Sequence, residues 1–143
     1  MFIYITYIAI VALSVFIMEI IAILSHKYIM HGPGWFLHES HHTKRKNFFE
    51  LNDLFFIVFS LPSILTIGYG MFNDSSIALC IGIGIGIYGF IYIFLHDIVV
   101  HNRLNLKISF NNSYFKKIKK AHAIHHSIKV KDGASHFGFI IYK

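Results

Sequence analysis

Three stretches of this sequence are long and apolar enough to cross a lipid bilayer as helices. Residues 1–24 contain one charged side chain, Glu19, and residues 54–72 and 77–95 contain none. A helix needs about 20 predominantly apolar residues to span the hydrocarbon core. Lys27 is the first basic residue and no small-residue cleavage site follows the first stretch, so we expect a retained helix and not a signal peptide. The sequence therefore predicts an all-α, multi-pass integral membrane protein with three clear transmembrane helices.

The composition agrees with a membrane protein and not with a soluble domain. Of the 143 residues, 55% are hydrophobic and only 14% are charged, whereas about a quarter of a soluble domain is charged. The length suits one domain, so we expect a single membrane-embedded domain over residues 1–143. A fourth span would need residues 28–37, which are too short and are interrupted by Gly32-Pro33-Gly34.

The basic residues indicate an orientation. All 13 Lys and Arg lie at or after Lys27, including the run at residues 44–46, and the turn at residues 73–76 contains none of them. Because basic residues concentrate on the cytoplasmic side, residues 25–53 and 96–143 are predicted to face the cytoplasm from a cell (plasma or inner) membrane. The net charge of +6 then forms one basic face, suited to anionic lipids and to an acidic protein partner.

Two patterns resemble nucleotide-binding or nucleic-acid-binding motifs, but their context argues against both. Gly84-x-Gly86-x-x-Gly89 matches a dinucleotide fingerprint, yet it lies within an apolar stretch that no strand precedes. Gly82, Gly86 and Gly89 are predicted instead to form one small-residue helical face that packs closely in the membrane. In residues 114–126, the 3-4-3 spacing of Phe115, Ile118, His122 and His125 places them on one helical side and the lysines on other faces. This pattern predicts an interfacial helix with lysines at lipid headgroups and no nucleic-acid partner.

Histidine is the most unusual component of the segments outside the spans. Ten of the 11 histidines fall into four groups, two spaced H-x4-H and two spaced H-x2-H-H. The groups are His26 and His31; His38, His41 and His42; His96 and His101; and His122, His125 and His126. Each group lies in a segment that the lysines assign to the cytoplasm, so the groups are expected to converge below one membrane surface. His136 stands alone and is interpreted as a structural or solvated residue.

The spacing within each group suits metal binding to different degrees. On a helix, positions i, i+3 and i+4 lie within about 100° of one another, so each H-x2-H-H group is expected to present a three-imidazole face. Positions i and i+5 differ by about 140°. His26 and His31 are therefore expected to reach different metals, or to depend on unwinding near residues 32–34.

Ten imidazoles are too many for one ion, so two metals are predicted. Protonated imidazoles in a cluster would repel one another, whereas a metal binds them in the neutral form. Imidazole suits iron, zinc, copper and nickel alike. The chain has one Glu-x-x-His pair, Glu39 with His42, where carboxylate di-iron bundles need two. A di-haem cytochrome would carry axial histidines within its spans, and residues 54–72 and 77–95 contain none.

Four carboxylates are candidates to accept hydrogen bonds from the outer N–H groups of metal-bound histidines: Glu19, Glu39, Asp53 and Asp97. Glu19 lies two helical turns before His26 on the same face, and a buried acid within a span is costly unless it is useful. Because Glu19 is near a helix end, a simple hydrogen-bonding role is equally compatible with the pattern.

The segments HKYIMHG, ESHH, NDLFF, YGFIYIFLHDIVVH and KKAHAIHH resemble the bacterial β-carotene 3-hydroxylases, in the histidine-rich fatty-acid hydroxylase/sterol desaturase superfamily. The resemblance covers residues 18–139. It implies a non-haem di-iron monooxygenase that uses O2 to hydroxylate C3 of the β-ionone rings, converting β-carotene to β-cryptoxanthin and zeaxanthin. It also implies that two irons are bound by the histidines of the four groups, and that electrons come from a ferredoxin-like carrier and its reductase. The ligands implied are His26, His31, His38, His41, His42, His96, His101, His122, His125 and His126.

The residues themselves agree with this chemistry. No flavin, haem or nicotinamide motif is present, so electrons are expected from an external donor, and a basic face would steer an acidic carrier. A carotenoid dissolves only in the bilayer, so a metal site at the membrane surface could meet its ring. Two alternatives remain: hydroxylation or desaturation of another membrane lipid such as a fatty acid or sterol, and metal binding without catalysis.

Overall fold

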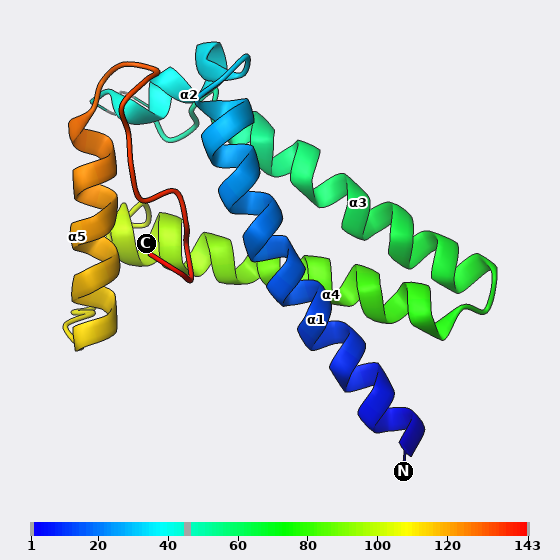
Figure 1. Cartoon of the computed structure of the whole chain (residues 1–143). Helices are drawn as coiled ribbons and strands as arrows, with labels where there is room; N and C mark the ends of the chain where they lie inside the picture. Colours follow the sequence, from blue (N-terminus) through cyan, green and yellow to red (C-terminus); the bar gives the residue numbers. More distant parts are fainter. Residues whose placement is uncertain (1, 45–46, 143) are drawn as a thin grey trace. The chain divides into compact units, whose positions relative to one another are not determined.

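The computed structural model describes residues 2–44 and 47–142, and within these residues every regular element is helical (Figure 1). The elements are α1 (Phe2–Ser25), η1 (His26–Met30), α2 (Trp35–His42), α3 (Asp53–Phe72), α4 (Ser76–Tyr92), η2 (Ile93–Val100) and α5 (Ser113–Ser127). Both η elements are π-helices. The all-α prediction is confirmed. Arg45 and Lys46, part of the basic run used for orientation, lie outside the described residues.

Three helical segments of the described chain are long and apolar enough to span a membrane: Phe2–Met30, Asp53–Phe72 and Ser76–Val100. The prediction of three clear spans is thereby confirmed. The first and third continue past the predicted ends at residues 24 and 95, because a π-helix extends each α-helix into the histidine-bearing sequence. Residues 31–34 form a turn and α2 has only eight residues, so residues 28–37 do not form a fourth span.

The backbone divides into two compact units. The helical hairpin unit comprises residues 1–18 and 55–91, and the histidine unit comprises residues 19–54 and 92–143. These are units of packing, so the single membrane-embedded domain over residues 1–143 stays a prediction.

In the helical hairpin unit, small residues let α3 and α4 approach closely. The Ser63 hydroxyl donates a hydrogen bond of 2.7 Å to the Gly82 carbonyl, and a Cβ at Gly82 would lie 2.9 Å from the backbone nitrogen of Ile67. Gly86 faces the Ser63 hydroxyl on the same side, but a Cβ at Gly89 would meet nothing within 4 Å. The predicted small-residue face is therefore correct for Gly82 and Gly86 and wrong for Gly89.

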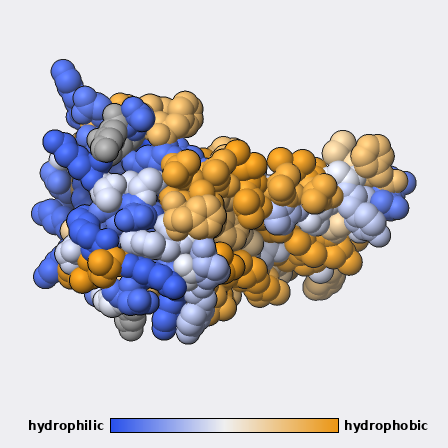
Figure 2. All heavy atoms as spheres, turned by 90° about the horizontal axis from the view of Figure 1, so that it is seen from above, coloured by the Kyte–Doolittle hydropathy of each residue, from blue (hydrophilic) through white to orange (hydrophobic). Residues whose placement is uncertain are grey.

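The outer surface of this unit is apolar. Large side chains such as Leu65, Met71 and Phe72 are mostly exposed. Apolar residues, orange in Figure 2, cover most of the visible surface of the hairpin. Exposed aliphatic and aromatic side chains on helices of this length suit a hydrocarbon environment.

The histidine unit contains the short helices and the carboxyl-terminal segment. Asn112 caps α5 by accepting a hydrogen bond from the Phe115 amide, and the helix buries Ile118, His122 and His125 while its lysines at positions 116, 117 and 120 are exposed. The segment from residue 128 onward, which we call the tail, runs back along α5 (Figure 1). The Tyr114 hydroxyl near the start of α5 donates to the Ile140 carbonyl at 3.2 Å.

The Gly32-Pro33-Gly34 turn reverses the chain between η1 and α2. The Gly34 amide donates to the Ile29 carbonyl at 2.7 Å, and a Cβ at Gly32 would collide with the Tyr28 carbonyl. Only glycine fits so close to the preceding turn. The reversal places the histidines of α2 against those of η1.

Candidate metal centre

The four histidine groups combine into two buried clusters within the histidine unit. The first cluster is His26, His31, His38, His42 and His125, and the second is His41, His96, His101 and His122. Within each cluster, one ring nitrogen from every residue lies within 4.8 Å of the others. His126, the remaining member of the four histidine groups, lies beside the second cluster. Its ring centroid is 4.3 Å from that of His122. His136 is outside both, and its ring contacts the Ser135 hydroxyl.

The two H-x4-H pairs converge because the backbone is π-helical at each of them. The His31 amide donates to the His26 carbonyl at 3.0 Å, and the His101 amide donates to the His96 carbonyl at 2.9 Å. This i to i+5 bonding widens the helix, so residues five apart align on one face. The expectation that His26 and His31 reach different metals is therefore wrong, since it assumed α-helical geometry. Local widening, and not unwinding at residues 32–34, joins them.

The histidines of each H-x2-H-H group are divided between the two clusters. In α2, His38 and His42 enter the first cluster, whereas His41 enters the second. In α5, His125 enters the first cluster and His122 the second. The three histidines of each group therefore do not converge on a single cluster. Each helix passes between the clusters and supplies histidines to both, because positions i and i+3 lie on the two flanks of its inward face.

In the first cluster the Nε2 atoms face one another. His38 Nε2 lies 3.1 Å from His26 Nε2 and 3.2 Å from His42 Nε2. His31 Nε2 lies 3.2 Å from His125 Nε2. All five side chains are buried.

The Nδ1 atoms of the first cluster are bonded on the outside. Four of them contact backbone carbonyls of the tail, and a carbonyl oxygen can only accept, so each Nδ1 carries the hydrogen. The pairs are His26 with Phe137 (3.0 Å), His31 with Lys131 (2.8 Å), His42 with Ile128 (2.8 Å) and His125 with Ser135 (2.7 Å). His38 contacts the Asn52 side-chain oxygen at 2.7 Å. The Nε2 atoms consequently present lone pairs to the cluster interior.

The second cluster has the same inward arrangement but different outer partners. The Nε2 atoms of His41 and His96 are 2.9 Å apart, and those of His101 and His122 are 2.8 Å apart. His41 Nδ1 donates to the Glu50 carboxylate at 3.1 Å. His96 Nδ1 donates to the Asp97 carboxylate at 2.8 Å. For His41 and His96, carboxylates thus take the place that carbonyls have around the first cluster.

Burial favours the neutral form of five clustered imidazoles outside the spans. It lowers the pKa of His38 and of His125 to about 3, and that of His42 to about 4. The pKa values of His41 and His122 are also well below the ordinary value, because burial and the neighbouring imidazoles both disfavour a proton. Neutral imidazole is the form that binds a metal.

This donor set fits a metal ion in each cluster. Two imidazole nitrogens about 3 Å apart repel each other through their lone pairs unless a cation lies between them. Two ligand nitrogens that each lie about 2.1 Å from a metal, at right angles to each other, are about 3.0 Å apart. The Nε2 of His126 supports the same conclusion, because it is buried without a hydrogen-bond partner. The outer carbonyls and carboxylates fix the tautomer, as they do for histidines bound to metals generally.

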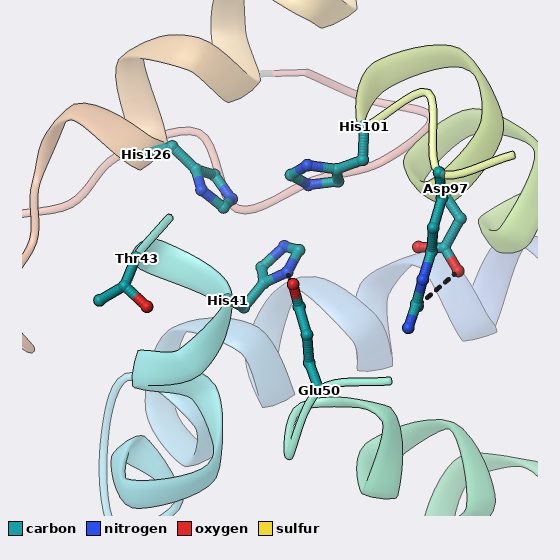
Figure 3. A pocket seen from close by; sticks show the side chains of 7 residues that line it. His41, Thr43, Glu50, Asp97, His101 and His126 are labelled. Carbon is teal, nitrogen blue, oxygen red and sulfur yellow. Dashed lines mark hydrogen bonds and ion pairs between the residues drawn. The ribbon is translucent and has the colours of Figure 1, made fainter. Parts of the chain in front are cut away.

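The second cluster adjoins a polar cavity of about 210 Å³. Figure 3 shows the rings of His41, His101 and His126 directed toward one another, with Thr43, Glu50 and Asp97 around them. Arg103, which also lines the cavity, donates to Asp53 at 2.7 Å and to Asp97 at 3.3 Å. The carboxylate that orients His96 is therefore itself held by a guanidinium.

Of the four carboxylates predicted to accept hydrogen bonds from histidines, one is seen to do so in the described residues. Asp97 contacts a histidine as expected, Asp53 pairs with Arg103, and Glu39 is exposed on α2. Glu19 is buried and accepts backbone amides of the tail, so its predicted role as an acceptor from a histidine stays a prediction. The sequence reasoning missed Glu50 as an acceptor, as well as Asn52 and the four tail carbonyls. Glu50 could have been predicted as an acceptor, because it lies between the second histidine group and the second span. The backbone carbonyls could not, because every residue has one.

The fold and the two clusters define a helical membrane protein with a paired histidine site suited to two metal ions. Sequence comparison then places it: the model of the fatty acid hydroxylase family matches residues 11–142. The chain belongs to this family.

The relatives include proteins named "Beta-carotene hydroxylase" from Pseudescherichia vulneris and Pantoea ananas. They are 45% and 44% identical to this chain over 131 residues, which are 92% of this chain and 74% of each relative. "Beta-carotene hydroxylase 2, chloroplastic" of Capsicum annuum is 43% identical over 78% of this chain and 37% of the relative. No solved structure matches the chain.

Proposed function

We propose that this protein is a membrane monooxygenase that hydroxylates C3 of the β-ionone rings of β-carotene, giving β-cryptoxanthin and zeaxanthin. The similarity to proteins named beta-carotene hydroxylase along 92% of the chain supports the substrate. The reaction consumes O2 and two electrons from an external donor. Two iron ions would be held by ten histidines, the nine of the two clusters together with His126.

One observation carries this proposal: two sets of largely buried imidazoles converge through Nε2, while the Nδ1 atoms of the first set and those of His41 and His96 are bonded outward. The similarity to proteins named as hydroxylases argues for an enzyme and against a metal-binding protein without catalysis. When bound, the iron pair supplies the activation of O2 that oxidation of a ring methylene requires. The histidines hold the ions, the tail carbonyls and Asn52 orient the first set, and Glu50 and Asp97 orient the second.

The substrate would approach from the bilayer. A carotenoid is insoluble in water, and the first and third spans end in η1 and η2, which bear His26 and His96. A ring entering from the lipid therefore travels along the same helices that carry the ligands.

Electrons would arrive from the cytoplasmic side, where we place the clusters. The exposed lysines at positions 116, 117 and 120 of α5 lie on the helix that supplies His122 and His125. A ferredoxin-like carrier with an acidic surface would be steered to such a face. The carrier's reductase would then reduce it again. The same lysines can contact anionic lipids when no carrier is bound.

The decisive experiment is pigment analysis of β-carotene-producing cells that express this chain. β-Cryptoxanthin and zeaxanthin should accumulate, and a His38→Ala variant at equal abundance should yield neither. Unchanged β-carotene with hydroxylated fatty acids or sterols in the same cells would redirect the activity to another lipid. Unchanged β-carotene without any oxidised lipid, in cells supplied with ferredoxin and its reductase, would contradict the proposal.

A further inference from the structure

The tail is the outer support of the first cluster. Four of the five histidines in that cluster donate through Nδ1 to carbonyls of residues 128, 131, 135 and 137. Two phenylalanines of the tail also cover the rings: Phe137 contacts His26 edge-on at 5.3 Å, and Phe139 stacks on His26 at 5.5 Å with an interplanar angle of 8°. The position of the tail therefore determines where these imidazoles point.

The tail has no regular secondary structure of its own. Its described residues, 128–142, contain neither helix nor strand. A segment without a hydrogen-bond ladder stays ordered only where something else ties it down. Its far end must consequently be fixed by contacts with the rest of the unit.

Glu19 makes that contact. One oxygen of its carboxylate accepts hydrogen bonds from three successive backbone amides, those of Phe139 (3.0 Å), Ile140 (2.9 Å) and Ile141 (2.9 Å). The side chain is only 2% exposed. Burying a carboxylate is costly unless it is well bonded, and bonds from N–H donors to an ionised acceptor are among the strong ones.

Gly138 lets the tail turn tightly around this carboxylate. A Cβ at position 138 would collide with the Ile141 carbonyl and lie 3.2 Å from the bonded oxygen of Glu19. The turn and the carboxylate therefore depend on each other, and either can be altered without touching a histidine.

We infer that Glu19 is a positioning residue that anchors the tail and thereby holds the histidines of the first cluster in their metal-binding orientation. This inference rests on the proposed two-metal site. The second cluster has its own outer partners, Glu50 for His41 and Asp97 for His96. Loss of the anchor should consequently weaken one metal position and spare the other.

The test uses the full chain purified in detergent, with metal content measured before and after exposure to EDTA. Glu19→Ala removes the anchor, Gly138→Ala opens the turn while keeping the carboxylate, and Glu39→Gln is a control that neutralises an exposed carboxylate of the same unit. Wild type and the control should hold about two metals per chain. Both anchor variants should bind one of the two roughly 10–100-fold more weakly, which is the loss of affinity typical of removing outer partners, and should lose that metal to EDTA first.

Combined variants identify which metal is lost. Glu19→Ala added to His38→Ala should make the one remaining metal no easier to remove with EDTA, whereas Glu19→Ala added to His122→Ala should make its one remaining metal roughly 10–100-fold easier to remove. Wild-type retention in both anchor variants would overturn the inference, and so would equal loss of both metals. A wild-type protein that binds no metal pair would instead contradict the proposed function, so the two failures are distinguishable.

Discussion

The backbone amide of His31 donates to the carbonyl of His26 at 3.0 Å, which closes a π-helical turn between two histidines of one cluster. A hydrogen bond of the same kind, from the His101 amide to the His96 carbonyl, closes a π-helical turn at the end of the third span. Both spans therefore end in a widened turn that carries their histidines. π-helical turns are frequently found at functional sites.

Because His26 and His31 share a cluster, removing either should cost the same metal. His26→Ala, His31→Ala and the double variant should each retain about one of two metals, since the first loss already empties the first cluster. His31→Ala combined with His101→Ala should retain none. Elemental analysis of the purified proteins measures this. Complete metal loss in the His26/His31 double variant, with one metal in each single variant, would mean that the two histidines serve different ions.

Replacing both His125 and His126 by alanine should abolish hydroxylation. His125 belongs to the first cluster and His126 lies beside the second, so the double variant affects both positions. His136→Ala should keep most of the activity, because His136 lies outside both clusters. Zeaxanthin yield in β-carotene-producing cells is the measurement, with membrane abundance checked by immunoblot. Full activity of the double variant would refute the assignment of the clusters as the reaction centre.

Glu50→Gln and Asp97→Asn should weaken the second metal position and leave the first intact. Each change keeps the size of the side chain but replaces a carboxylate that accepts from a histidine Nδ1. The expected loss of metal affinity is roughly 10–100-fold. Competition with a chromophoric chelator measures it, and Asp74→Asn in the turn between α3 and α4 is the matched control. Equal weakening of both positions would show that these carboxylates act on the fold as a whole.

The metal-free protein should lose stability as the pH falls below about 6.5. Burial lowers the pKa of His38 to about 3 and of His42 to about 4 from an ordinary 6.5. Between these values the unfolded chain binds protons that the folded chain does not, so protons favour unfolding. Thermal unfolding at pH 7.5, 6.0 and 5.0 should show a falling midpoint, and the holoprotein should release metal over the same range. A midpoint constant from pH 7.5 to 5.0 would contradict the burial of neutral imidazoles.

The orientation predicts the location of three tags. A tag after residue 44 and one at the end of the chain should report the cytoplasm, and a tag in residues 73–76 should report the opposite side. Cysteine accessibility in intact cells provides an independent measurement, because Cys80 is a natural thiol that can be replaced first. If residues 73–76 and the end of the chain label from the same side, the proposed cytoplasmic metal centre loses its basis.

Several features of this protein could be read from the sequence by itself, because each depends on local composition. Apolar runs at residues 1–24, 54–72 and 77–95 predicted the three spans, since the length of a helix and its hydropathy decide whether it can enter a bilayer. The histidine groups predicted a convergent metal-binding site, and Asp97 beside His96 predicted one acceptor.

Only the tertiary structure decided how the histidines are shared. His38 and His41 lie on one short helix, yet they enter different clusters, because the neighbours on the two flanks of α2 come from distant segments. The π-helical pairing of His26 with His31 was equally hidden, since the expectation from the sequence assumed the geometry of an α-helix. The tail carbonyls that orient the first cluster belong to the backbone, which every residue has, so their role arises from where the chain returns. Glu19 shows the same limit: its charge is visible in the sequence, but the three amides that it binds are 120 or more residues away.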